Sequence, residues 1–209
     1  SLFGKSPQSA ALPVSIESAT VLFEDAAAGF RETFRQGQLD LEPATTDPEG
    51  VAWSRISLSL DGQTVERLSL TGAVSLATRR FRVEASIDGF DFQPRLATLL
   101  PAGLIEADWS RQAATGLSMR LHLNATATGA VDDLAAAAFE VSGGFAEGRF
   151  EHSRLPFPLT DMTASFTADR EGISVTGASA RSGAMLFRGS AQAHGWNEQA
   201  DFTCLLEAE

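Results

Sequence analysis

The residue types that most often carry out chemistry are few in this chain and widely spaced. The three histidines, His122, His152 and His194, lack the close spacing of metal-binding motifs. Two adjacent carboxylate pairs, Glu24-Asp25 and Asp132-Asp133, fall at a predicted strand end and a predicted helix start, where solvation or capping accounts for them. We therefore predict no catalytic residue, no bound metal and no cofactor, and a protein that is not an enzyme.

Other candidate motifs are equally weak. The three tryptophans, Trp53, Trp109 and Trp196, are too scattered to form a platform that stacks on sugar rings. The glycines of "SGGFAEG" at 142–148 lie between strands, without the helix that a phosphate-binding loop requires, and are interpreted as a turn or bulge. The single cysteine, Cys204, excludes an intramolecular disulfide, and its alternation with apolar neighbours in "DFTCLL" predicts a small buried residue.

The overall charge narrows the choice of partners. The chain has 16 Lys and Arg against 27 Asp and Glu, which gives a net charge of -11. A protein that binds nucleic acid or a strongly anionic membrane surface needs a basic patch, so neither is expected as a partner.

Alternation of apolar and polar residues is the main signal in the sequence. In "LTGAVSLATRRFRVEASIDGF" at 70–90, apolar residues occupy every second position on both sides of a turn at Thr78-Arg79. The same pattern predicts strands near 14–24, 37–42, 51–60, 65–77, 80–90, 117–130, 137–151, 159–168, 172–179, 184–193 and 199–207.

Short turns between these strands predict an all-β fold, a long curled antiparallel meander that forms a β-groove or an open barrel-like sheet. One or two short helices are expected, with helical signals at 26–36, 93–103, 108–114 and 132–138. The sequence from Thr71 resembles that from Thr128, and both an internal repeat and a chance likeness between alternating strands would explain this. We predict one β-rich domain over 1–209, with 1–49 as a possible separate segment. The chain is expected to be part of a longer protein, and any targeting or anchoring segment is expected to lie outside it.

The apolar sides of so many strands must contact something, and helices are too scarce to cover them. One hypothesis is a groove in which lipid acyl chains complete the packing. The alternative is a structural or protein-binding β-sandwich, in which the same side chains form a dry core. The predicted groove residues are Leu68, Leu70, Val74, Leu76, Phe81, Val83, Ile87, Leu117, Met119, Leu121, Leu123, Phe166, Val175, Met185 and Phe187.

Two segments resemble AsmA-like proteins of the Gram-negative envelope. The segment "FDFQPRLATLLPAGLIEADWSRQAATG" at 90–116 is similar to the short helix with a Leu-Leu-Pro end that interrupts their strand repeats. The segment at 155–195 is similar to their repeating unit, with a proline-bracketed entry, a strand from Leu159 and a turn at Gly172.

This resemblance to the AsmA, TamB and YhdP group implies a function. Its members are anchored in the inner membrane and project a periplasmic β-groove. We therefore expect a periplasmic location, phospholipid or other lipid acyl chains as ligands, and a role in phospholipid transport or outer-membrane assembly. Envelope proteins are possible partners.

Overall fold

A computed structural model describes residues 13–25, 30–94, 96, 116–153, 155–196 and 201–209. It contains twelve strands and confirms the all-β class. The strands are β1 (Val14–Asp25), β2 (Phe30–Leu41), β3 (Thr45–Thr46), β4 (Ala52–Asp61), β5 (Val65–Ser75), β6 (Arg80–Phe92), β7 (Leu117–Ala130), β8 (Asp133–Phe150), β9 (Leu159–Asp169), β10 (Gly172–Ser182), β11 (Met185–His194) and β12 (Asp201–Ala208).

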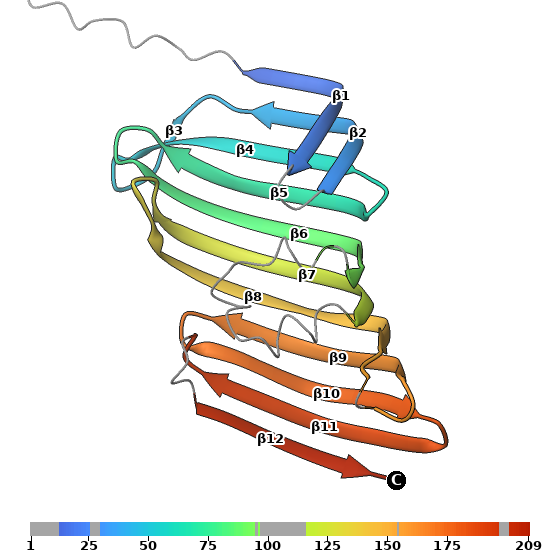
Figure 1. The fold of residues 1–209 in the computed structure, drawn as a ribbon. Coiled ribbons are helices and arrows are strands. Elements are labelled where there is room, and N and C mark those ends of the chain that lie inside the picture. The colour runs from blue at the N-terminus through green and yellow to red at the C-terminus, as the bar shows by residue number, and fades with distance from the viewer. Residues whose placement is uncertain (1–12, 26–29, 95, 97–115, 154, 197–200) are drawn as a thin grey trace, which may run out of the picture.

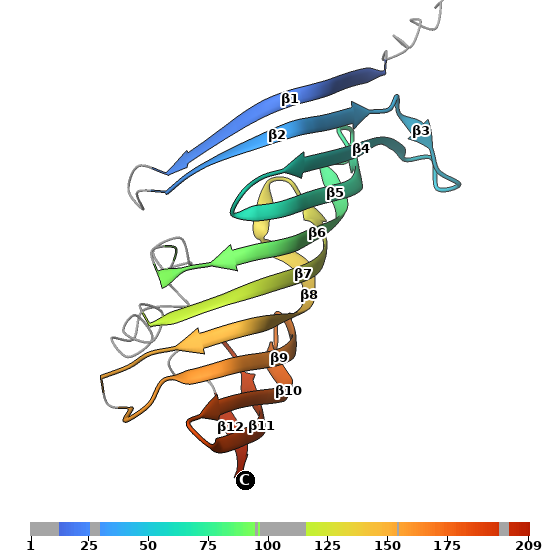
Figure 2. The ribbon, with the colours of Figure 1, turned by 90° about the vertical axis from the view of Figure 1, so that its right-hand side faces the viewer.

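The strands form one antiparallel sheet whose spatial order follows the chain. The order is β1-β2-β4-β5-β6-β7-β8-β9-β10-β11-β12, and β3 pairs with the side of β4. β1 and β12 lie at opposite ends, so the sheet stays open (Figure 1). The view turned by 90° shows the strands following one another along a twisted surface (Figure 2). The predicted meander is confirmed, and the described strands do not form the two packed sheets of a sandwich.

The N-terminal strands belong to this sheet. β2 pairs with β4 through Gln38 to Leu41, and β1 pairs with β2 along most of its length. The sheet therefore includes residues 14–25 and 30–41, which lie within the 1–49 segment.

Two helical predictions are wrong. Residues 30–36 of the expected helix at 26–36 lie in β2, where Phe34 pairs with Val21. In the expected helix at 132–138, β8 begins at Asp133, and Ala138 pairs with Thr128. The helix preference of residues such as alanine is worth less than about 1 kcal/mol each, which pairing with neighbouring strands readily overcomes. The expected helices at 93–103 and 108–114 fall almost entirely outside the described residues.

Several strands contain a β-bulge, in which one strand has an extra residue relative to the strand that it pairs with. For example, the four residues from Ile87 to Phe90 face the three residues from Leu123 to Leu121. The extra residue shifts the alternation by one position, so that Ile87 and Phe90 point to the same side of the sheet. Bulges also bend a strand and increase its twist, which favours a curled sheet. The bulged residues with positive φ are Ser18 (56°), Gln36 (54°), Gly89 (61°), Glu147 (54°), Asp161 (51°) and Gly177 (60°).

The buried core is small for so extensive a sheet. Its main cluster contains Phe92 and Leu96, which are 3% and 1% exposed. Phe90 meets Phe92 edge to face, with ring centroids 6.2 Å apart. The buried hydrophobic residues among those described are Leu60, Val65, Ala73, Phe92, Leu96 and Ala164. In the same part of the chain, no helix is long and apolar enough to cross a bilayer.

Candidate functional site

One side of the sheet carries an uninterrupted row of apolar residues that crosses eleven strands. Each member lies directly opposite the next in the strand register, and directly opposite residues point to the same side of a sheet. At about 4.8 Å per strand, the row is about 48 Å long. The row contains Ile16, Leu39, Leu58, Leu70, Ala85, Ala125, Val141, Ala168, Ile173, Ala193 and Phe202.

We call the side of the sheet that carries this row the apolar face. A second row runs parallel to the first on the same face, beginning with the pair Leu60 and Leu68 and ending with the pair Ala191 and Cys204. The predicted residues Ile87, Leu123 and Phe166 lie within it. The predicted residues on this face are Leu68, Leu70, Val74, Phe81, Val83, Ile87, Leu117, Met119, Leu121, Leu123, Phe166, Val175, Met185 and Phe187.

Leu76 is the exception among the predicted residues. β5 ends at Ser75, and Leu76 begins the turn that leads to β6. Its side chain is 82% exposed. Leu76 therefore lies beyond the end of the strand, where the alternation that grouped it with Leu70 no longer applies.

Most of the apolar face is only partly covered. Leu70, Phe81 and Phe166 are all half-buried. At the two ends of the long row, Ile16 is 46% exposed and Phe202 is 69% exposed. An apolar surface left in contact with water over this many strands is typical of an interaction site.

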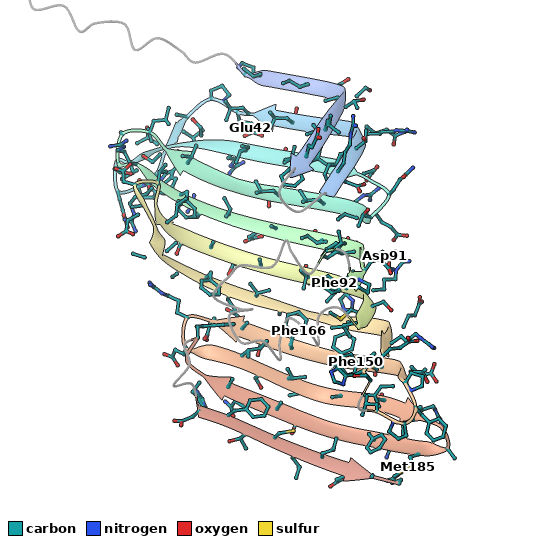
Figure 3. The ribbon with its side chains drawn as sticks, in the orientation of Figure 1. Glu42, Asp91, Phe92, Phe150, Phe166 and Met185 are labelled. Atoms are coloured by element: carbon teal, nitrogen blue, oxygen red, sulfur yellow. The ribbon has the colours of Figure 1, made fainter. Side chains whose placement is uncertain are left out.

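The predicted residues differ in their surroundings. Leu117, Met119 and Leu121 pack against the cluster of Phe92 and Leu96, so they form part of a small core. Figure 3 shows Phe92, Phe150 and Met185 toward one edge of the sheet, where β6 and β8 end and β11 begins. Leu68, Leu70, Val83, Ile87 and Phe166 lie outside that cluster, and they are better candidates for contact with a ligand.

The strands β8 to β12 surround a hollow of about 160 Å³ on the apolar face. Val175 and Phe187 line it, as the sequence analysis predicted for the site. Several other lining residues were not among the predicted groove residues. The additional apolar residues are Phe145, Met162, Ala178, Ala180, Ala191, Cys204, Leu205 and Leu206.

Cys204 is exposed, and the prediction that it is buried is wrong. Its side chain lies on the apolar face opposite Ala191 of β11. Among the described strands, β12 pairs only with β11, so its side chains have neighbours on one side alone. Alternation placed Cys204 on the correct face, but it could not show whether another layer covers that face.

The opposite side of the sheet is polar. Its longest row is made of short hydroxyl and amide side chains, and a hollow of about 390 Å³ lies over part of it, lined by Glu84, Glu140 and their neighbours. Because its side chains are polar, this side suits contact with water, whereas the apolar face suits contact with an apolar partner. The row contains Ser59, Ser69, Ser86, Asn124, Ser142, Thr167, Ser174, Gln192 and Thr203.

The polar face also accounts for Trp53. The guanidinium of Arg82 lies 4.8 Å from the centre of its ring, and its indole N–H donates a hydrogen bond of 2.9 Å to Asp47. The hydrogen bond from the Val51 amide lowers the pKa of the Asp47 carboxyl, and the bonds from Trp53 and the Glu49 amide act in the same direction. Trp53 therefore lies at the start of β4, and its side chain holds the loop that contains Asp47.

The described residues contain no group of three or more His, Cys, Asp or Glu placed to bind a metal ion. His122 points to the polar face, and His152 stacks on Phe150 with ring centroids 6.1 Å apart. The prediction that the protein is not an enzyme stays a prediction.

No protein-family model, no curated protein and no solved structure matches the chain. The candidate site is therefore defined by the geometry of the sheet alone.

Proposed function

We propose that the apolar face binds lipid acyl chains, and that the protein is a periplasmic β-groove section with the role of AsmA-like proteins in phospholipid transport or outer-membrane assembly. The observation that carries the proposal is the apolar row from Ile16 to Phe202, which stays partly exposed across eleven strands. A row of this length exceeds what a small-molecule site needs, but it fits one or more extended acyl chains.

The physical chemistry of the face favours chains over compact ligands. Each methylene removed from water contributes about 0.8 kcal/mol, whatever its position along the chain. A surface of aliphatic and aromatic side chains without fixed polar groups would therefore retain acyl chains and allow them to slide. Leu70, Ala85 and Ala125 are adjacent members of the row and offer no hydrogen bond to hold a head group.

The experiment compares two double variants that differ only in the face they alter. Leu70→Asp with Phe166→Asp places charges on the apolar face, whereas Thr71→Asp with Thr167→Asp places them on the polar face of the same two strands. Binding of a fluorescent fatty acid should weaken at least tenfold in the first variant and stay within about twofold in the second.

Circular dichroism would establish that both variants keep their strands. Equal binding by the two folded variants would contradict the proposal. A protein-binding role for the same face stays a prediction, and such a role would leave fatty-acid binding absent in the wild-type protein as well.

A further inference from the structure

Two neighbouring turns present aliphatic side chains to solvent at one edge of the sheet, on the left in Figure 1. Leu76 lies in the turn between β5 and β6, and Val131 and Leu134 lie where β7 leads into β8. They are 82%, 47% and 65% exposed. We call these three residues the aliphatic tip. Turns ordinarily carry polar residues and glycine, so three exposed aliphatic side chains at this place indicate an interaction site.

The two turns are held together firmly. The guanidinium of Arg79 pairs with the carboxylate of Asp132 at 2.9 Å, and the Val131 amide donates a hydrogen bond of 2.8 Å to the Arg79 carbonyl. The tip is therefore a prearranged surface, which can bury three side chains at once without first paying the entropy of ordering a loop.

We propose that the aliphatic tip inserts into the interface of a lipid bilayer and brings the apolar face to the source of its acyl chains. This inference rests on the proposed function. Leu76 follows directly on β5, and Val74 and Phe81 form an opposite pair at the start of the apolar face beside the same turn. A chain leaving a bilayer at the tip would meet apolar side chains immediately.

The charges near the tip determine which bilayer fits. Arg79 and Arg80 adjoin the tip, but Asp132 and Asp133 balance them, and the whole chain has a net charge of -11. An anionic surface would repel such a protein, whereas a zwitterionic surface would not. We therefore expect stronger binding to vesicles of phosphatidylcholine than to vesicles that contain 30% phosphatidylglycerol, a composition we chose to make the surface anionic.

The first experiment measures co-flotation with phosphatidylcholine vesicles. Leu76→Asp with Leu134→Asp should reduce the partition coefficient at least tenfold, because it removes most of the aliphatic surface. The control, Leu155→Asp with Phe157→Asp, makes the same charge change at residues that are 37% and 60% exposed in the connection between β8 and β9, at the other end of β8 from the tip. Equal binding by both variants, or no binding by the wild-type protein, would overturn the inference.

A second experiment reads the insertion directly. In a Cys204→Ser background, Leu76→Cys labelled with an environment-sensitive dye should shift to the blue on addition of vesicles, whereas Thr203→Cys on the polar face should not. An unshifted spectrum at position 76 would contradict insertion, and a shift caused by an added soluble protein instead would indicate a protein partner.

A third measurement separates this inference from the proposed function. The tip variant should bind a soluble fluorescent fatty acid as the wild-type protein does, because the apolar face is intact. Fatty-acid binding without vesicle binding by the wild-type protein would overturn the tip alone. Vesicle binding without fatty-acid binding would contradict the proposed function and leave the tip as a membrane contact.

Discussion

Glu32 is a buried carboxylate whose removal should destabilise the sheet. It lies in β2 and is only 4% exposed. One oxygen accepts hydrogen bonds from the backbone N–H groups of Gln63 and Thr64, at 2.7 and 3.2 Å. These two residues form the turn between β4 and β5, so a side chain from one strand holds the turn of the next hairpin. Gly62 permits this approach, since a Cβ there would lie 2.6 Å from the carboxylate.

The size of the effect follows from these contacts. A hydrogen bond to a charged group contributes about 1.5–3 kcal/mol, and the two bonds share one oxygen and a partly solvated turn, so we expect Glu32→Ala to cost about 3 kcal/mol. For a chain of this size, that corresponds to a fall in Tm of roughly 6–12 °C. Glu32→Gln keeps an acceptor oxygen without its charge, and it should cost about half as much.

Urea unfolding followed by circular dichroism provides the assay. The matched control is Gln38→Ala, which alters an exposed residue of the same strand and should change the free energy of unfolding by less than about 0.5 kcal/mol. A loss below about 1 kcal/mol in Glu32→Ala would refute the reasoning, because it would mean that water replaces the carboxylate without penalty.

Three further predictions test the loops and the core. Gly89→Val should lower Tm, because Gly89 has φ of 61° and a Cβ there would lie 2.3 Å from the Glu66 carboxylate; an unchanged Tm would contradict the bulge. The pKa of the Asp47 carboxyl is lowered by its hydrogen bond from the Val51 amide. The ionised carboxyl therefore stabilises the fold above the ordinary pKa of 3.8, and this stabilisation is lost as the pH falls through the lower pKa of the folded state. Asp47→Asn should flatten the acid side of the curve of Tm against pH. Phe92→Ala should cost about 3–5 kcal/mol in urea unfolding, and a loss under 1 kcal/mol would mean that its cluster is not a core.

Alternation predicted the sheet well because a strand that has one wet side repeats every two residues. The limits of β7 were predicted without error at 117–130, and those of most other strands within a few residues. The first half of β2 and the start of β8 were missed, because their residues favour a helix locally and only pairing with neighbouring strands makes them extended. A single sequence carries the local preference but not the pairing.

The candidate site was also predicted in part. Phe81 and Val175 could be assigned to the apolar face from periodicity alone. The bulge at Glu147 lies within 142–148, where the glycines had predicted a turn or bulge. The bulge at Asp161 was not visible, since a positive φ at a charged residue leaves no mark in composition. The role of Glu32 was likewise hidden, because its hydrogen-bond donors lie about thirty residues away in the chain.

The central claim is that acyl chains cover the apolar face. Native mass spectrometry of the gently purified protein, combined with organic extraction, tests it most directly. We expect phospholipid bound in defined stoichiometry to the wild-type protein and to Thr71→Asp with Thr167→Asp, and its loss from Leu70→Asp with Phe166→Asp. Absence of phospholipid from the wild-type protein, together with no uptake of fatty acid, would contradict the claim.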